Sequence, residues 1–238
     1  MDKLVQGAKQ LGIVLSKEQT DRFQLYYEEL VAWNRRMNLT AITEFEEVQV
    51  KHFLDSLTVV PALGEILGSE GGMNLLDVGT GAGLPGIPIK LVVPQIRLVL
   101  LESVTKKTGF LKHVSDRLGL ENVEVLTDRA EELAHQPEHR EAFDAVVSRA
   151  VSRLPTVAEL SLPFCRLGGL FIAQKKGAIE DEVDQAARAI KLLGGRLREI
   201  RPVASDFLTE RSLVIVEKVS SSPQRYPRRP GIPAKRPL

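Results

Sequence analysis

Cysteine is almost absent from this sequence of 238 residues, which contains only Cys165. One cysteine cannot form a disulfide within the chain, and such scarcity is typical of a reducing compartment. Cysteine and histidine do not cluster at the spacing of a zinc site, so we expect no metal. No apolar run approaches the ~18 residues of a membrane span, and residues 1–9 lack the apolar core of a signal peptide. These absences predict a cytoplasmic protein that needs neither a membrane nor a metal.

Acidic residues are missing from residues 219–238, which carry five basic ones: Arg225, Arg228, Arg229, Lys235 and Arg236. Because the formal net charge of the whole chain is +1, the other residues together carry about −4. A weakly acidic body with a basic tail predicts a local contact with nucleic acid. Prolines and serines are frequent in residues 220–238, so we expect this tail to be extended and weakly ordered.

The rest of the composition is ordinary for a globular protein, with 43% hydrophobic and 26% charged residues. The length suits one α/β domain with an extension. Residues 1–68 are predicted to form a helical cap. Within it, the apolar residues from Glu18 to Trp33 share one helical face, and Ser16 with Gln19 predicts a capping box at the start of that helix. Residues 69–219 form the main domain, and residues 220–238 form the tail.

After a glycine-rich junction at Leu63–Met73, strand patterns alternate with helical patterns, which indicates a parallel α/β sheet. The last two strands are expected to form an antiparallel hairpin at the sheet edge, giving the seven-stranded, mostly parallel sheet of class I methyltransferases. The predicted strands are Asn74–Val78, Ile96–Leu101, Val123–Leu126, Phe143–Val147, Gly169–Gln174, Gly195–Val203 and Arg211–Val219. A helix is predicted near Leu154–Cys165, with Cys165 in the core.

The segment 75–88, Leu-Leu-Asp-Val-Gly-Thr-Gly-Ala-Gly-Leu-Pro-Gly-Ile-Pro, is the centre of the sequence. It combines a short buried strand, a turn rich in glycine and the start of a helix. Glycine accepts a positive φ and lets a ligand approach the backbone closely. A strand, turn and helix in this order form a cradle for a nucleotide or a cofactor at the carboxyl end of a parallel strand.

Two cofactors are compatible with this cradle. The pattern Gly81-x-Gly83-x-x-Gly86, followed by Glu102, satisfies the dinucleotide fingerprint of NAD enzymes. Asp77, two residues before Gly79, is instead typical of motif I of S-adenosylmethionine (SAM) methyltransferases, whose cofactor carries cationic amino and sulfonium groups. SAM is therefore favoured over NAD. An NAD-dependent oxidoreductase stays an alternative, weakened by Asp77 and by the lack of a Tyr-x-x-x-Lys motif.

Ligands of such sheets bind beyond the carboxyl ends of the strands. Those ends carry residues 79–83, Glu102, residues 128–131, residues 148–149 and residues 175–176. Glu102 is expected to accept the two ribose hydroxyls, and the backbone of Ala130 and Glu131 is expected to contact adenine. His52 and Asp55 can share a helix face, and we expect a structural hydrogen bond between them rather than an acid–base pair.

The methyl acceptor follows from elimination. The fourth strand ends in Val-Ser-Arg-Ala, residues 147–150, and lacks the Asn/Asp-Pro-Pro-aromatic motif of enzymes that methylate exocyclic amines. Methylation at cytosine C5 needs a cysteine nucleophile, and Cys165 is assigned to the core. Guanine N7 has a free lone pair and no proton to remove, so positioning suffices. Arg129, Arg149 and Lys176 are predicted to hold phosphate or the guanine edge.

Several motifs occur together: Asn38-Leu-Thr-Ala-Ile, His52-Phe-Leu-Asp-Ser, the segment from Asp77 to Pro88, Glu102-Ser-x-x-Lys-Lys, Arg129-Ala-Glu, Ser148-Arg-Ala and Lys176-Gly. With the tail from Tyr226 to Lys235, they make the whole chain resemble the bacterial RsmG (GidB) family. The resemblance implies a cytoplasmic enzyme that uses SAM to methylate N7 of one guanosine in 16S ribosomal RNA of the small ribosomal subunit.

The resemblance also assigns residues. It implies cofactor contacts at Gly79, Leu84, Ala130, Glu131 and Arg149, a ribose site at Glu102-Ser103-Val104, and RNA or catalytic roles for Arg129, Arg149 and Lys176. With Asp77, Gly81 and Gly83 from motif I, these form the predicted site of a monomeric enzyme. A noncatalytic ribosome-assembly factor that senses SAM or a nucleotide stays the alternative from another class.

Overall fold

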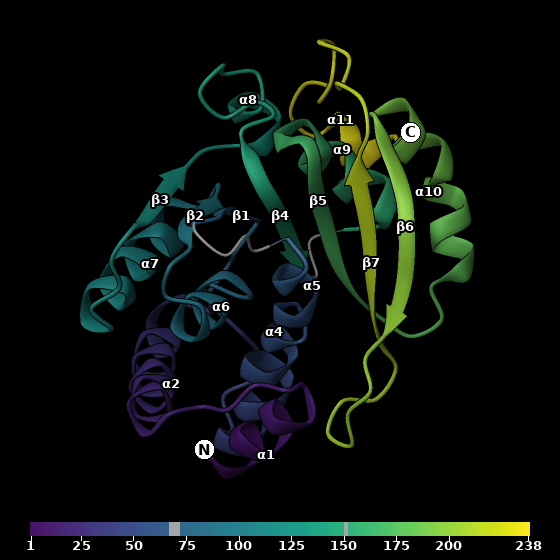
Figure 1. Cartoon of the computed structure of the whole chain (residues 1–238). Coiled ribbons are helices and arrows are strands. Elements are labelled where there is room, and N and C mark those ends of the chain that lie inside the picture. Colours follow the sequence, from purple (N-terminus) through teal and green to yellow (C-terminus); the bar gives the residue numbers. More distant parts are fainter. Residues whose placement is uncertain (67–71, 150–151) are drawn as a thin grey trace.

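Seven strands form one mixed sheet in the order β3-β2-β1-β4-β5-β7-β6 (Figure 1). The computed structural model describes residues 1–66, 72–149 and 152–238; the predicted junction lies partly outside them, as does Ala150. Strands β1 to β5 are parallel, and β7 runs antiparallel to both β5 and β6. The strands are β1 (Asn74–Val78), β2 (Arg97–Glu102), β3 (Val123–Thr127), β4 (Phe143–Arg149), β5 (Cys165–Lys176), β6 (Gly195–Pro202) and β7 (Arg211–Lys218).

The predicted strands and the terminal hairpin are thus confirmed, with one difference around Cys165. The helix expected to reach this residue ends earlier, because α9 (Leu154–Ser161) is followed by a 3-10 turn, η2 (Leu162–Phe164). Cys165 begins β5 instead, but it is fully buried, as a core residue should be.

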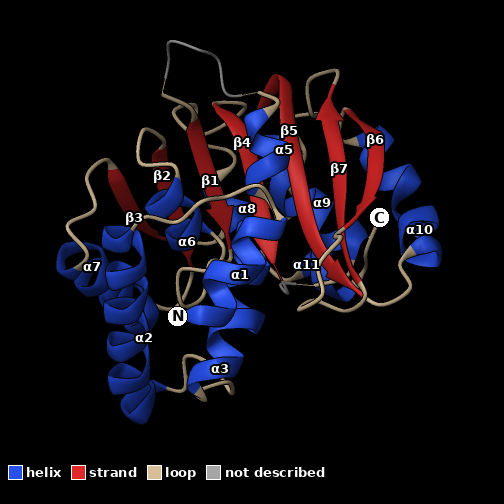
Figure 2. Ribbon diagram, turned by 60° about the horizontal axis from the view of Figure 1, so that its bottom comes forward, coloured by secondary structure: helices blue, strands red, loops and turns tan. Residues whose placement is uncertain are grey.

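Helices cover both faces of the sheet (Figures 1 and 2). Because side chains alternate along a strand, Leu75 packs into one core cluster and Leu76 into the other. The first cluster also contains the N-terminal helices, which therefore share a core with the sheet. The helices of that face are α1 (Asp2–Gln10), α2 (Lys17–Met37), α3 (Phe45–Val48), the π-helix η1 (Gln49–Leu54), α4 (Asp55–Leu57), α5 (Val60–Gly64), α6 (Gly86–Val92) and α7 (Thr105–Arg117). The other face carries α8 (Ala130–Leu133), α9, α10 (Glu180–Leu192) and α11 (Ile232–Lys235).

Helix α2 begins as the sequence predicts. The Gln19 amide donates to Oγ of Ser16 at 3.1 Å, and the Ser16 amide donates to Oε1 of Gln19 at 2.9 Å, which completes the capping box. The helix buries Phe23, Tyr26 and Leu30. Its buried face therefore lies against the sheet side that carries α6 and α7.

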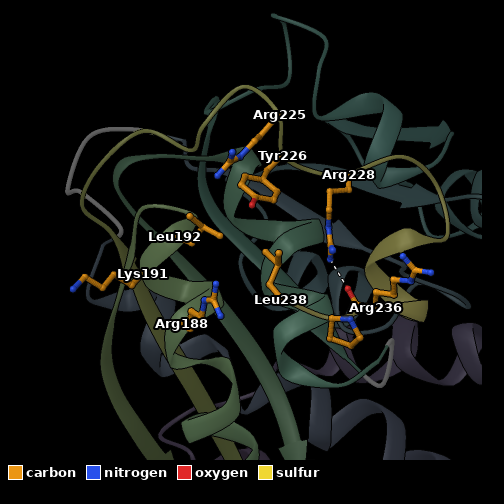
Figure 3. Close-up of a pocket in the computed structure, with 9 residues that line it drawn as sticks. Arg188, Lys191, Leu192, Arg225, Tyr226, Arg228, Arg236 and Leu238 are labelled. Carbon is orange, nitrogen blue, oxygen red and sulfur yellow. Dashed lines mark hydrogen bonds between the residues drawn. The ribbon is translucent and has the colours of Figure 1, made fainter.

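The prediction of a weakly ordered tail is wrong. Tyr226 is only 7% exposed, and the guanidinium of Arg228 pairs at 2.6 Å with the carboxylate of Glu159, which is completely buried. The guanidinium of Arg140 donates to the carbonyls of Ser222 and Tyr226. Figure 3 shows Arg228 also reaching the carbonyl oxygen of Arg236, at 2.7 Å. This order could not be predicted from the composition of the tail, because the residues that hold it, Glu159 and Arg140, lie on α9 and in the loop after α8.

Within the described residues, no helix is both long and apolar enough to cross a membrane. Those same residues contain no group of three or more His, Cys, Asp or Glu side chains that could hold a metal ion.

Candidate functional site

Three hollows adjoin the carboxyl ends of the parallel strands. The Glu102 hollow, of about 230 Å³, is lined by residues that include Gly79, Glu102, Ser103, Arg129, Ala130 and Glu131. The Thr40 hollow, of about 250 Å³, is lined by residues that include Thr40, His52, Gly79, Gly81, Leu84 and Arg149. The Lys176 hollow, of about 590 Å³, is lined by residues that include His52, Asp55, Arg149, Gln174, Lys176 and Arg211.

Three residues join these hollows. Gly79 lines both the Glu102 hollow and the Thr40 hollow, which together form a trough across the end of β1. Arg149 and His52 line both the Thr40 hollow and the Lys176 hollow. The trough and the Lys176 hollow therefore meet at the side chains of Arg149 and His52.

The glycine turn has the left-handed backbone that its sequence predicts. Gly79 has a φ of +68°, and the amides of Gly79 and Thr80 both donate to the carbonyl of Leu101, which ties β1 to β2. Gly83 has a φ of +90° but faces α6 and α2: an added Cβ would lie 2.4 Å from Cδ1 of Ile87 and 2.8 Å from the hydroxyl of Tyr26. Gly79 thus opens the site to a ligand, and Gly83 allows helices to pack behind it.

Tyr26 supports this turn from α2. Its hydroxyl donates to the carbonyl of Ala82, inside the glycine-rich turn. Complete burial raises the pKa of Tyr26 well above its ordinary value, so the hydroxyl keeps its proton and remains a donor. The N-terminal helices therefore help to fix the shape of the trough.

Asp77 points into the protein rather than into the trough. Its Oδ2 accepts from the hydroxyl of Thr80 at 2.6 Å and from the amide of Gly86 at 2.8 Å, so the carboxylate joins both ends of the turn. Burial raises the pKa of Asp77 to about 6, although these two hydrogen bonds oppose the shift. The structure therefore places Asp77 as a brace of the turn, away from where the sequence argument put it beside a cationic ligand.

Glu102 lies at the trough, as predicted, and is held rigidly. One carboxylate oxygen accepts from the amide of Gly81 at 3.1 Å, and the other accepts from the amide of Val104 at 2.9 Å. A carboxylate offers about four lone-pair directions, so Glu102 can accept further hydrogen bonds from a ligand. Ser103 and Val104 follow it and are exposed.

Helix α8 begins at Ala130, on the far side of the Glu102 hollow. The carboxylate of Glu131 accepts from the amide of Gly231 in the C-terminal tail at 3.0 Å. This wall therefore offers a ligand the backbone of Ala130 and Glu131, together with the acceptor capacity that the Glu131 carboxylate keeps beside its bond to Gly231. Arg129 is exposed at the same hollow, so the structure separates it from Arg149 and Lys176.

Arg149 is held by an acid that sequence reasoning did not connect with it. Nη1 of Arg149 lies 3.0 Å from Oδ2 of Asp55, and Nε of Arg211 lies 3.0 Å from Oδ1 of the same carboxylate. Nη1 of Arg149 also donates to the carbonyl of Lys51 at 3.0 Å. Asp55 is almost completely buried, so it fixes the two guanidinium groups side by side.

The expected hydrogen bond between His52 and Asp55 does not form. Nε2 of His52 lies 2.8 Å from the hydroxyl of Thr40, and Nδ1 lies 3.1 Å from the carbonyl of Lys51. Burial, with the nearby charge of Arg149, lowers the pKa of His52 to about 4. The imidazole is therefore neutral near pH 7. His52 lies in a π-helical turn, whose wider i→i+5 spacing differs from that of the α-helix assumed in the prediction and accounts for the different partner.

Arg211 and Gln174 line the same hollow as Lys176, and neither was predicted from the sequence as a site residue. Arg211 pairs with Lys176 in the register between β7 and β5. The known position of the seventh strand in class I folds, between the fifth and the sixth, is the signal that could have found Arg211.

Comparisons with known proteins place the sequence in a family. A sequence model of the family described as "GidB: rRNA small subunit methyltransferase G" matches residues 19–214. The chain is 50% identical over 239 residues to the ribosomal RNA small subunit methyltransferase G of Dehalococcoides mccartyi, with 100% of both chains covered. It is 47% identical to the protein of the same description from Pelotomaculum thermopropionicum, with 100% of this chain and 98% of that one covered.

Solved structures show the same fold at low sequence identity. A SAM-dependent methyltransferase from Aquifex aeolicus matches with a TM-score of 0.55 and 17% identity, over 76% of this chain and 97% of that one. TrmN from Thermus thermophilus matches with a TM-score of 0.52 and 17% identity, over 72% and 53% of the respective chains. The predicted class I methyltransferase fold is confirmed.

Proposed function

Because the chain belongs to the rRNA small subunit methyltransferase G (GidB) family, we propose that it methylates N7 of a guanosine in 16S ribosomal RNA of the small ribosomal subunit. SAM is the methyl donor, and S-adenosylhomocysteine and 7-methylguanosine are the products. The observation that carries the proposal is the meeting of the trough and the cationic Lys176 hollow at Arg149 and His52.

The trough has the chemistry that SAM requires. Glu102 has acceptor capacity left for ribose hydroxyls, and the backbone of Ala130 and Glu131 faces the adenine end of the Glu102 hollow. The methionine end then lies in the Thr40 hollow, against Gly81 and Leu84. Bound there, SAM supplies a methyl group on a sulfonium, which a neutral nucleophile can accept.

The Lys176 hollow suits an RNA nucleotide. Lys176 is exposed, and Arg149 and Arg211 are fixed beside it by Asp55. Oε1 of Gln174 is buried and has no hydrogen-bond partner among the described residues. It can accept an N–H from the guanine base, while the cationic groups hold phosphate or the guanine O6.

The reaction asks little of the chain beyond placement. Guanine N7 attacks through its own lone pair, so no general base is required, and the lowered pKa of His52 makes its imidazole only a weak base. Arg149, at the junction of the trough and the Lys176 hollow, orients the base toward the methyl donor. We assign Lys176 to RNA binding and Arg129 to a contact at the outer rim of the trough.

Transfer of a labelled methyl group tests the proposal. We would offer labelled SAM with small subunits from a strain that lacks this gene, and with the free 16S rRNA in parallel. Borohydride reduction and aniline cleavage then map any 7-methylguanosine. We expect label at one guanosine. SAM binding without transfer to either substrate would favour the noncatalytic assembly factor.

We also propose that the protein acts in the cytoplasm as a monomer. Sedimentation of the active protein tests the monomeric state.

A further inference from the structure

The C-terminal segment 226–234 lies over the Glu102 hollow. Gly231 and Ala234, at the start of α11 and within it, line that hollow opposite the strand ends that carry Gly79 and Glu102. We propose that this segment is a wall of the adenosyl site and that it sets how tightly the cofactor is held. The inference rests on the proposed function, because it takes the Glu102 hollow to receive the adenosyl group.

A hydrogen bond joins the segment to the side of the trough where adenine is predicted to bind. Gly231 has a φ of +81°, and its amide donates to Oε1 of Glu131 at 3.0 Å. Glu131 is only 7% exposed, and it belongs to the first turn of α8, whose backbone faces the hollow. The carboxylate of Glu131 thus holds the tail in place.

Two anchors fix the segment on either side of Gly231. Before it, the amide, Nε and Nη2 of Arg228 all donate to the carboxylate of Glu159, which is fully buried in α9. After it, the hydroxyl of Thr156 donates to the carbonyl of Pro233 at 3.0 Å. Thr156 itself lines the Glu102 hollow. The wall is therefore rigidly placed and needs no ligand to order it.

The chemistry of the wall fits a purine. Gly231 and Ala234 present backbone and a methyl group, which pack against a flat ring and do not compete for its hydrogen bonds. Ala234 is exposed, and it contributes to the lining of the hollow. A ligand in the Glu102 hollow thus covers an otherwise exposed apolar group.

A chain that stops after Pro230 tests the wall. This variant keeps the pair between Arg228 and Glu159 but removes Gly231 and Ala234. We would measure the Kd of SAM and of 5′-methylthioadenosine, which lacks the amino-acid end, by calorimetry without RNA. We expect both Kd values to rise about tenfold, the scale of one lost apolar contact. An equal factor for both ligands would place the wall at the adenosyl end.

A second variant covers the case in which the shortened chain unfolds. Ala234→Trp fills the hollow and should raise both Kd values at least tenfold, while Lys235→Ala, one residue further on, should leave them unchanged. Thermal unfolding without ligand checks that the folds match. Unchanged binding by Ala234→Trp, or weaker binding of SAM alone, would overturn the inference. If the wild-type chain bound neither ligand, the proposed function itself would fail.

Discussion

The trough and the Lys176 hollow lie on either side of Arg149, and they are built in different ways. In the trough, acidic and basic side chains are balanced, and two of the carboxylates are fixed by the backbone: Glu102 and Glu131 both accept hydrogen bonds from main-chain amides. In the Lys176 hollow, cationic side chains dominate. They are Lys51, Arg149, Lys175, Lys176 and Arg211, and Asp55 is the acid among the described residues that line it.

This difference matches the two ligands of the proposed reaction. A small cofactor with a fixed shape is best held by rigid backbone and by a few acceptors. RNA is a polyanion, and its affinity depends on cationic side chains. The comparison predicts that variants on one side change the binding of one ligand and leave the other unaffected.

The largest effect is expected at the junction. Arg149→Ala should lower kcat about 10²- to 10³-fold, the usual loss when one positioned donor is removed from a reacting group. The Kd of SAM should change much less. Initial rates with saturating SAM and 16S rRNA, together with calorimetry, measure both quantities.

Two further variants sharpen this result. Arg149→Lys keeps the charge but loses the planar guanidinium, whose Nη1 donates to both Asp55 and the carbonyl of Lys51 and whose other nitrogens stay available, so it should recover only part of kcat. Arg97 begins β2 and so lies at the amino ends of the parallel strands, away from the site. Arg97→Ala should therefore keep full activity. Normal turnover by Arg149→Ala, or a loss confined to SAM binding, would contradict the assignment of Arg149 to the positioning of the RNA base.

The next effect concerns the brace of the trough. Asp77→Ala leaves the hydroxyl of Thr80 and the amide of Gly86 without their buried acceptor. It should therefore reduce the free energy of unfolding by about 2–3 kcal/mol. Asp77→Asn keeps an acceptor oxygen and should cost less. Urea unfolding of the three proteins gives both values.

The pH dependence of stability gives an independent check on Asp77. Its pKa is raised from 3.8 to about 6 in the folded protein, so the folded state holds this proton more tightly than the unfolded chain does. The resulting stabilisation is fully present below about pH 4 and is lost as the pH rises to about 6. The free energy of unfolding of Asp77→Asn should lack this dependence on pH. If its slope against pH equals that of the wild-type protein, a group other than Asp77 titrates in this range.

A smaller effect is expected on the RNA side. Lys176→Ala should weaken binding of 16S rRNA and reduce the slope of log K against log salt by about 1, because one phosphate contact is lost. The Kd of SAM should not change. Filter binding at several salt concentrations measures the slope, and Lys112→Ala, on the exposed side of α7, is the matched control. Equal slopes for the wild-type protein, Lys176→Ala and Lys112→Ala would show that Lys176 does not contact a phosphate of the RNA.

The smallest effect tests support from α2. Tyr26→Phe removes the donor to Ala82 and should lower the free energy of unfolding by about 1 kcal/mol. It should also weaken SAM binding slightly, because the turn loses a restraint. Tyr27→Phe is the control, since that hydroxyl bonds to Thr43, outside the turn. If the two variants bind SAM equally well, Tyr26 serves packing alone.

Much of the fold could be predicted because its signals are local. The glycine turn and the alternating strands and helices each occupy a short window of sequence, and the strand-end rule brought Glu102, Arg149 and Lys176 to one edge of the sheet. The order of the tail could not be predicted, since it depends on Glu159 and Arg140, which lie far away in the sequence.

The orientation of Asp77 was open to prediction from the strand pattern. In β1, residues 75 and 77 point to the same face because side chains alternate, and Leu75 packs into the core under α6. The strand pattern thus already implied that Asp77 points toward the helix rather than toward a ligand. The motif identified the residue as important, and its hydrogen-bond partners are Thr80 and Gly86 of the turn itself.

The two walls of the Glu102 hollow have a consequence for biosynthesis. Gly79 and Glu102 are made early, whereas Gly231 and Ala234 follow all seven strands in the chain. All seven strands therefore precede one wall of the hollow in the chain, and the sheet can form while the hollow is still open on that side. The hollow is completed only when the final segment docks and Arg228 reaches Glu159, so a chain cut short before Gly231 would have a native sheet and an incomplete hollow.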